Sequence, residues 1–445
     1  MEKEDILKNV SNLTADQLFK FISEGSVTLQ DLQSTGCLDA VKRKKINDLV
    51  TNFQKEDNAA WAKASYGNES SLRDYISNYP TGIHVQEAKD KIDSLVQERK
   101  NAQSAKHGIL NDIRENSNRF SPRDIRHFLS NVTITKNDLI DNNIPNNIID
   151  YLENMIPPRL QLGETPSSIP EGYTEVYFWG IPGSGKTCAL AAILSTAEKE
   201  GYLNIATGPG YDYTTKLKNI FINGTSTLPP PSPVESTQYL PFTLKKRDEK
   251  HHRSVSLIEL SGEIFQCFYY KNANVPFPTQ DHQVTFNNLM NFLNGKNRKT
   301  HFFFIDYDMK NKQDNFGYTQ ADYLAAASTF FKNNEIFGKT ADAIYVVLTK
   351  SDLMPVAKDE RIKHSKEHLN NHNFSAFINT LRDNCKKYSI NGGKLIFEPF
   401  TLGEVYFQEI CEFDNESANK IIDLLFERIK PSKNSILEKL NVLNQ

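Results

Sequence analysis

The chain has 445 residues, of which 38% are hydrophobic and 24% charged, as in a globular protein of two or three domains. A net charge of −3 argues against nucleic acid as a default partner, and no apolar run approaches the ~18 residues of a membrane span. The five cysteines contain no C-x-x-C pair, which indicates neither a disulfide framework nor a zinc site. The N-terminal stretch is acidic, unlike a signal peptide. We therefore expect a cytoplasmic protein.

An internal repeat marks the N-terminal third of the chain. Residues 14–32 align without gaps at their centre with residues 121–139, and in both copies apolar side chains recur at the spacing of a buried helix face. Thr28 and Thr135 each precede an aspartate by three residues, which predicts a helix N-cap with an acid in the first turn. Each copy therefore predicts a helix, a short turn and a second helix, within helical modules at 1–55 and 106–156.

The segment between the copies, 56–105, carries another helical pattern. Trp61, the Tyr79-Pro80-x-Gly82 run and Ala88 are spaced as in a tetratricopeptide-type hairpin. The whole N-terminal region is expected to be all-α. We expect it to form either a helical cap on the next domain or a set of adaptor modules that recruit a protein partner. The sequence is also compatible with an oligomer.

A linker at 157–172, rich in proline, glycine and serine, leads into the second half of the chain. The sequence GIPGSGKT then fits the P-loop pattern G-x-x-x-x-G-K-[ST], between an apolar run at 174–180 that predicts a strand and an Ala/Leu-rich helix at 186–200. In that order, loop N–H groups and the helix N-terminus bind a phosphate. We assign nucleotide binding to Gly180, Pro182, Gly183, Ser184, Gly185, Lys186, Thr187 and Cys188.

The region after the P-loop helix begins helix-like at residue 211 and becomes proline-rich before residue 237. Two strand-like runs follow, at 238–247 and 253–262, and predict a hairpin. A mobile loop that feeds such a hairpin is the arrangement of switch I in Ras-like GTPases. The sequence does not choose which hydroxyl would meet Mg²⁺ among Thr225, Thr227, Ser236 and Thr237.

The second strand of this hairpin ends in ELSGE, which resembles the D-x-x-G-Q motif of switch II. Glu259 replaces the aspartate that holds Mg²⁺ through water, and Gly262 is kept, with its N–H available to the γ-phosphate. Glu263 replaces the glutamine that orients the attacking water. Since phosphate repels a carboxylate in that place, we expect hydrolysis to be slow or to depend on a partner.

A second strand also ends in acids. Residues 299–308 form an apolar run that finishes with Asp306 and Asp308, and either carboxylate is a rival to Glu259. If Asp306 or Asp308 were the acid on the metal side, the protein would be a signal-transducing ATPase.

A further motif, TKSD, follows the apolar strand that begins at residue 342 and matches the [NT]-K-x-D guanine motif. Asp352 can accept hydrogen bonds from both N1–H and the N2 amine of guanine, a pair that adenine does not offer. The stem of Lys350 would cover the base, next to Thr349. Leu402 stands where a short loop would contact the base. The sequence around it predicts a helical span at 358–388, a helix at 417–429 and an amphipathic tail at 432–445.

Together, these motifs resemble the Ras-like, translation-factor-related (TRAFAC-class) P-loop GTPases over residues 173–431. The resemblance implies an α/β P-loop NTPase fold, with a mostly parallel sheet and one antiparallel hairpin, preceded by the all-α region. It implies GTP or GDP as ligand, with Mg²⁺ held at Thr187 and Glu259. It assigns catalytic roles to Lys186, Thr187, Glu259, Gly262 and Glu263.

The long proline-bearing switch I and the helical N-terminal region are similar to GTPases of bacterial conflict and defence systems. The expectation is then a guanine-nucleotide switch whose N-terminal modules recruit a partner. A nucleotide-bound scaffold without turnover is the remaining alternative.

Overall fold

The computed structural model describes residues 2–155, 160, 169–208, 210–230, 238–309, 312–338, 340–371 and 373–429. The chain divides into two compact units, Met1–Asn111 and Asp112–Gln445. The predicted tail at 432–445, most of the linker at 157–172 and the switch I candidates Ser236 and Thr237 lie outside the described residues.

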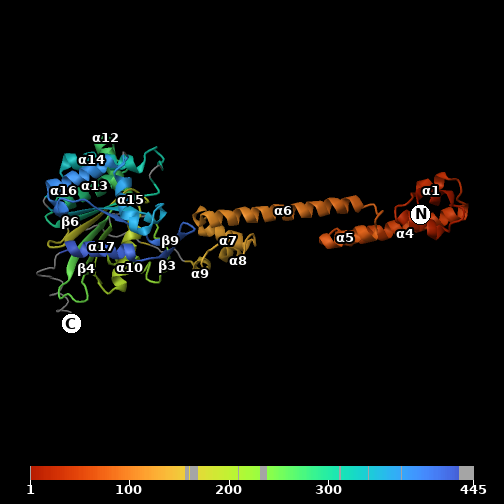
Figure 1. The fold of residues 1–445 in the computed structure, drawn as a ribbon, viewed down its shortest axis with the longest axis horizontal. Helices are drawn as coiled ribbons and strands as arrows, with labels where there is room; N and C mark the ends of the chain where they lie inside the picture. The colour runs from red at the N-terminus through yellow and green to blue at the C-terminus, as the bar shows by residue number, and fades with distance from the viewer. Residues whose placement is uncertain are drawn as a thin grey trace. The chain divides into compact units, whose positions relative to one another are not determined.

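The first unit is helical (Figure 1). Its helices are α1 (Lys3–Lys8), α2 (Ala15–Ser23), α3 (Leu29–Ser34), α4 (Ala40–Ala64), α5 (Glu69–Asn78) and most of α6 (Val85–Glu115). The first repeat copy forms α2 and α3, and Thr14 and Thr28 cap them in reciprocal capping boxes. Leu18, Leu32 and Ile46 from three of these helices meet in one buried cluster.

A second cluster of the first unit lies where the tetratricopeptide-like spacing was noted. The end of α4, α5 and the start of α6 bring Trp61, Tyr75 and Ala88 together. The buried carboxylate of Asp57 accepts hydrogen bonds from the Tyr75 hydroxyl and from the N–H of Ile83. None of the helices in the described part of the chain is both long and apolar enough to cross a membrane.

The second repeat copy opens the second unit. After a 3-10 turn, η1 (Ser117–Arg119), it forms α7 (Pro122–Ser130) and α8 (Lys136–Asp141), and α9 (Asn146–Asn154) follows. Ser121 and Thr135 cap α7 and α8 in capping boxes like those of the first copy. The helix, turn and helix predicted for each copy are therefore confirmed, with the same capping chemistry.

The main sheet has seven strands among the described residues, in the order β2-β4-β5-β1-β6-β7-β8. The strands are β1 (Thr174–Trp179), β2 (Leu203–Ile205), β4 (Gln238–Leu244), β5 (Arg253–Glu259), β6 (Arg298–Asp306), β7 (Ala341–Thr349) and β8 (Ile396–Pro399). Strands β5, β1, β6, β7 and β8 pair in parallel, whereas β4 is antiparallel to β5 and to β2. The predicted α/β P-loop fold, with a mostly parallel sheet and an antiparallel hairpin, is confirmed.

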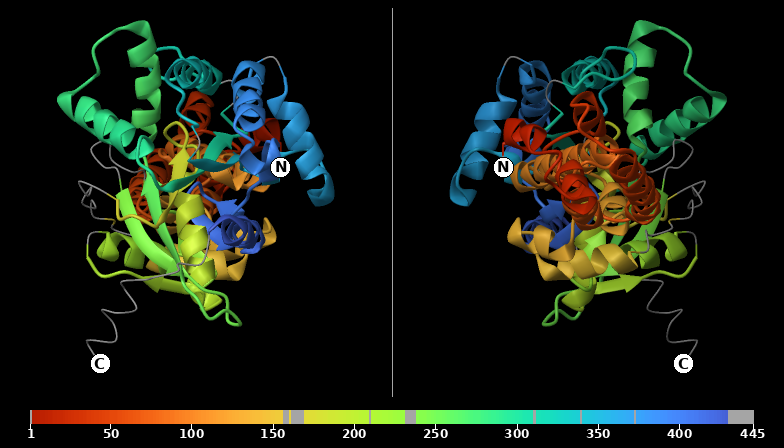
Figure 2. Two further views of the ribbon diagram at one scale, coloured as in Figure 1. Left: turned by 90° about the vertical axis from the view of Figure 1, so that its left-hand side faces the viewer. Right: turned by 90° about the vertical axis from the view of Figure 1, so that its right-hand side faces the viewer.

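Helices cover both faces of this sheet, and Figures 1 and 2 show α12 to α14 on the opposite side from α10. One face carries α12 (Gly262–Ala273), α13 (Gln280–Leu293), α14 (Gln320–Asn334) and α16 (Ser375–Lys387), and the other carries α10 (Lys186–Lys199), α11 (Tyr211–Lys218) and α17 (Glu416–Arg428). Aromatic side chains such as Trp179, Phe268 and Phe303 fill the first face. The central strands are therefore buried on both sides. Two of them, β5 and β6, end in the acids Glu259 and Asp306.

One sequence-based expectation for secondary structure was wrong. The helical span predicted at 358–388 is two helices, α15 (Arg361–Leu369) and α16, because the Asn371 carbonyl accepts from the N–H groups of Phe374 and Ser375 and closes a turn. After β8, the chain enters a second sheet with β9 (Gly403–Tyr406). That second sheet is antiparallel, in the order β3-β10-β9, with β3 (Thr225–Thr227) and β10 (Ile410–Phe413).

Candidate functional site

The P-loop is a closely packed turn between β1 and α10. Gly180 has a φ of +150°, and a Cβ there would lie 2.5 Å from Ser184 Oγ and 2.6 Å from the Phe304 carbonyl oxygen. Only glycine fits this position. The Ser184 hydroxyl donates to the Ile181 carbonyl at 2.8 Å, which closes the loop from inside. The loop before α10 is therefore held in one compact turn, at the helix N-terminus where phosphate groups bind in proteins.

Lys186 lies within this loop. Its ammonium donates to the carbonyl oxygens of Gly180 and Ile181, both at 2.9 Å, and the side chain is buried. Burial lowers the pKa of Lys186 to about 8, and the nearby Glu259 carboxylate opposes that shift. An anion bound in the cradle would stabilise the charged form of this lysine.

Glu259 is the acid that contacts the P-loop hydroxyl. It ends β5, which pairs with β1 in a register that sets Glu259 opposite Phe178. The Thr187 hydroxyl donates to one carboxylate oxygen of Glu259, and the Tyr213 hydroxyl donates to the other at 2.7 Å. Glu259 is 1% exposed. Sequence reasoning missed Tyr213, since nothing distinguishes this tyrosine from the other apolar positions of its helix.

Thr187 and Glu259 fit a magnesium ion. Among the described residues, no three His, Cys, Asp or Glu side chains gather to hold a metal. A buried hydroxyl beside a buried carboxylate is, however, a set of hard oxygen donors. It suits Mg²⁺, which takes few ligands from protein and the rest from phosphates and water.

Gly262, the glycine of ELSGE, packs directly on the P-loop. A Cβ at Gly262 would lie 2.0 Å from the Pro182 nitrogen, so the backbone at the start of α12 touches the backbone of the loop. Glu263 is the next residue, and its carboxylate reaches His282 on α13, with 3.3 Å between Oε2 and Nε2. No sequence pattern had singled out His282.

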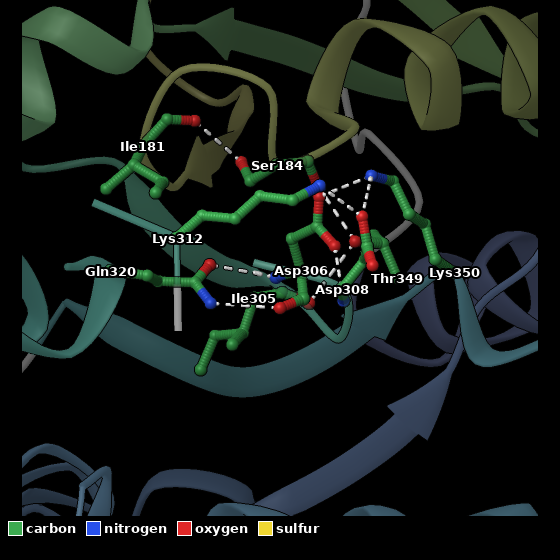
Figure 3. A network of polar contacts seen from close by, with 9 residues as sticks. All are labelled: Ile181, Ser184, Ile305, Asp306, Asp308, Lys312, Gln320, Thr349 and Lys350. Atoms are coloured by element: carbon green, nitrogen blue, oxygen red, sulfur yellow. Dashed lines mark hydrogen bonds and ion pairs between the residues drawn. The ribbon is translucent and has the colours of Figure 1, made fainter. Parts of the chain in front are cut away.

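The other two acids pair with lysines, as Figure 3 shows. Asp306 is fully buried at the end of β6, and its Oδ2 lies 2.9 Å from Lys350 Nζ. The Gln320 side chain bonds both the N–H and the C=O of Asp306, each at 2.9 Å. Asp308 pairs with Lys312 at 2.6 Å, and that hydrogen bond holds the pKa of Asp308 below its ordinary value. Asp306, at the end of β6, thus anchors the lysine of TKSD.

TKSD is attached to the P-loop by its first residue. The Thr349 hydroxyl lies 3.1 Å from the Ser184 carbonyl oxygen and 3.2 Å from that of Ile305. The side chain of Lys350 is partly exposed, and its φ is +53°. The segments around residues 184 and 349, 165 residues apart in the chain, therefore meet at the carboxyl edge of the sheet.

The loop predicted to contact a base is also present here. Thr401, next to Leu402, donates its hydroxyl to Asp352 Oδ1 at 2.8 Å. Leu402 packs against the α10 side of the core. The thiol of Cys188 is near both Glu259 and Lys350, and burial raises its pKa to about 12, so it stays a thiol. The structure thus brings the P-loop, TKSD and the 401–403 loop together.

The helical segment 112–155 packs on the small sheet next to this loop (Figure 1). The Tyr151 hydroxyl on α9 accepts from the N–H of Thr227 at 2.9 Å and lies 3.0 Å from the Thr227 hydroxyl. Asn147 donates to the Thr225 hydroxyl at 3.1 Å. Two of the four candidate switch I hydroxyls are therefore engaged by α9.

A second attachment lies at η1. Asn118 donates to the Val405 carbonyl at 2.9 Å and accepts from the N–H of Gln408 at 2.7 Å. Val405 belongs to β9, which begins at Gly403, two residues after the Thr401 that bonds Asp352. Hydrogen bonds thus connect TKSD to the helical segment through the β9–β10 hairpin.

The sequence matches no protein-family model and no curated protein. Among solved structures, the chain matches one in a crystal structure from Plasmodium falciparum, which is described as nucleolar GTP-binding protein 1. The two chains are 12% identical, the match covers 62% of this chain and 97% of that chain, and the TM-score is 0.25.

Proposed function

We propose that the protein is a guanine-nucleotide-binding switch that binds GTP or GDP with Mg²⁺ and hydrolyses GTP slowly or in response to a partner. The observation that supports this most directly is the hydrogen bond from Thr349 to the Ser184 carbonyl. It sets the guanine motif beside the phosphate cradle, so one nucleotide can contact both.

Each residue of the site has a task in this scheme. Lys186 and the loop amides neutralise the phosphate oxygens, while Asp352 accepts from N1–H and the N2 amine of guanine. Thr187 and Glu259 hold Mg²⁺, which would offset the charge that develops on the β- and γ-phosphates. Gly262 brings its N–H to the γ-phosphate, because its backbone already lies on Pro182.

The contact of Glu259 with Thr187 favours the GTPase over the ATPase alternative. An ATPase that used Asp306 or Asp308 would need one of these carboxylates at the metal. Both instead form ion pairs with lysines, Asp306 with Lys350 and Asp308 with Lys312.

The helical segment 112–155 would report the nucleotide state to a protein partner. Its contacts with β3 and with the β9–β10 hairpin offer a route from the base to α9. Recruitment by the N-terminal modules, membership of the TRAFAC class and a role in bacterial defence rest on the sequence motifs alone.

The first experiment is to denature the purified protein and identify the released nucleotide by chromatography. We expect GTP or GDP. In binding assays, Asp352→Asn should weaken GTP binding by about 10–100-fold, since it removes a charge-assisted pair of hydrogen bonds, and leave ATP binding unchanged. A protein that retains ATP, ignores GTP and does not respond to Asp352→Asn would reject the proposal.

Phosphate release then separates a switch from a scaffold without turnover. Multiple-turnover release above a Lys186→Ala control excludes the scaffold. Release at the level of that control, with GTP bound, would establish it.

A further inference from the structure

The Glu263 side chain lies between the P-loop end of α12 and a buried histidine of α13. It follows Gly262, whose backbone touches Pro182 of the P-loop. It also lies in the first turn of α12, where the helix dipole favours a negative charge. Its carboxylate is partly exposed and lies 3.3 Å from His282 Nε2, while the His282 side chain is 8% exposed.

The second ring nitrogen of His282 is engaged as well. Thr279, the N-cap of α13, places its hydroxyl 2.8 Å from His282 Nδ1. A tautomer in which Thr279 donates to Nδ1 and Nε2–H donates to Glu263 satisfies both contacts at once. Thr279, His282 and Glu263 thus form a chain of hydrogen bonds that ends in the first turn of α12, one residue after the Gly262 backbone that contacts the P-loop.

We propose, on the basis of the function proposed above, that His282 is a positioning residue for GTP hydrolysis. It holds the Glu263 carboxylate at the γ-phosphate end of the cradle, where Glu263 orients and deprotonates the attacking water. Without a fixed donor, repulsion by the phosphate would turn this carboxylate away. The helix N-terminus and the imidazole together oppose that repulsion.

The reaction balances with the groups present. The water oxygen forms a bond to the γ-phosphorus as the bond to the β–γ bridging oxygen breaks, and that electron pair stays on GDP. The proton of the water passes to Glu263 and then to the released phosphate. His282 keeps its proton throughout and acts only through Glu263.

Single-turnover hydrolysis of GTP in the full-length protein tests this role with a matched pair of variants. In His282→Gln the amide nitrogen takes the place of Nε2 and still reaches Glu263, whereas in His282→Asn it falls short. We expect His282→Asn to slow hydrolysis by at least ~10-fold and His282→Gln to restore most of the rate, because a well-placed acid or base contributes about 10²–10⁴-fold. Both variants should bind a fluorescent GTP analogue as the wild type does.

A double-variant cycle shows whether His282 acts through Glu263. Since the two form one unit, Glu263→Ala with His282→Asn should be no slower than Glu263→Ala alone. His368→Ala, another buried histidine, on α15, is the control for loss of packing and should leave the hydrolysis rate near that of the wild type.

Three results would overturn the proposal: equal rates for His282→Asn and His282→Gln, additive losses in the double variant, or no hydrolysis above Lys186→Ala. If the fluorescent GTP analogue binds in the first two cases, the proposed function stands and only the role of His282 is lost. In the third case, binding of the analogue leaves only the nucleotide-bound scaffold without turnover. If it does not bind to wild type, the proposed function fails too.

Discussion

Two pairs of buried ionisable side chains in the second unit differ in their partners. Glu259 and Lys186 lie at the carboxyl edge of the sheet and contact P-loop atoms. Glu175 and Lys299 lie at the opposite end of β1 and β6, 3.5 Å apart, where Glu175 also accepts from the Tyr177 hydroxyl at 2.6 Å. The second pair serves the core, since Lys299 is further held by backbone carbonyls rather than by any group of the site.

His301, in β6, predicts a pH dependence of stability. Its Nδ1 accepts from Trp179 Nε1 at 3.0 Å, and burial, with Lys299 nearby, lowers its pKa to about 3. The unfolded chain protonates this histidine near pH 6.5, so it binds more protons than the folded chain between about pH 6.5 and 3. Stability is therefore full above that range and falls with decreasing pH, by about 1.4 kcal/mol per unit from this residue.

His301→Asn keeps an acceptor for Trp179 and removes the titration. In urea unfolding followed by tryptophan fluorescence, the wild type should lose stability relative to this variant with each step from pH 6.5 towards 4.5. Parallel pH profiles for the two proteins would contradict the buried, neutral state of His301.

The identity of the acid at the metal can be decided by Mg²⁺ dependence. In wild type, chelation of Mg²⁺ should weaken GTP binding by at least ~10-fold, because phosphate charge is left uncompensated. Glu259→Gln should abolish that dependence. Asp306→Asn is the matched control: it breaks the ion pair with Lys350 and should leave the Mg²⁺ dependence intact. If instead GTP binding by Asp306→Asn no longer depended on Mg²⁺ and that of Glu259→Gln still did, the metal-side acid would be Asp306, as in the ATPase alternative.

At the scale of elements, the three-stranded sheet β3-β10-β9 connects parts of the second unit that the main sheet does not. Its strands have 3 or 4 residues each. Helix α9 contacts β3, and η1 contacts the β9–β10 hairpin. Strands this short cannot stand alone in water. The helical segment 112–155 and the small sheet should therefore open together.

Tyr151→Phe tests this joint stability. The variant removes the hydroxyl that accepts from the Thr227 N–H and so costs about 1 kcal/mol, or roughly fivefold in local opening. Hydrogen exchange should become faster in β3 and in the β9–β10 hairpin. Exchange in the central strands β1 and β6 serves as the internal reference and should not change. Faster exchange limited to α9 would show that the small sheet is stable without it.

At the scale of the whole molecule, the candidate site collects segments from most of the second unit. The P-loop, the end of β5, TKSD and the loop before β9 lie far apart in the chain, yet all follow strands of one mostly parallel sheet. Such strands point their carboxyl ends to the same edge, which is where ligands bind in open α/β sheets. The fold thus converts four local motifs into one site.

Much of this arrangement could be predicted from the sequence because its determinants are local. The glycines and Lys186 of the P-loop, the capping threonines of both repeat copies and the apolar runs of the central strands each act within about one element of chain. The small sheet could not be predicted, because its strands are too short for a periodic pattern. The helix expected at 358–388 was divided by a turn at Asn371 that its composition did not indicate.

The sequence by itself determined the P-loop turn, the repeat and the central strands and helices of the main sheet, since hydrophobic period, caps and glycine positions are properties of neighbouring residues. Only the tertiary structure decided that Glu259 touches Thr187 while Asp306 pairs with Lys350. It alone brought Tyr213 and His282 to the site and α9 onto β3. The physical reason is that sheet register and helix packing, which choose among chemically equivalent side chains, depend on contacts between segments that are distant in the chain.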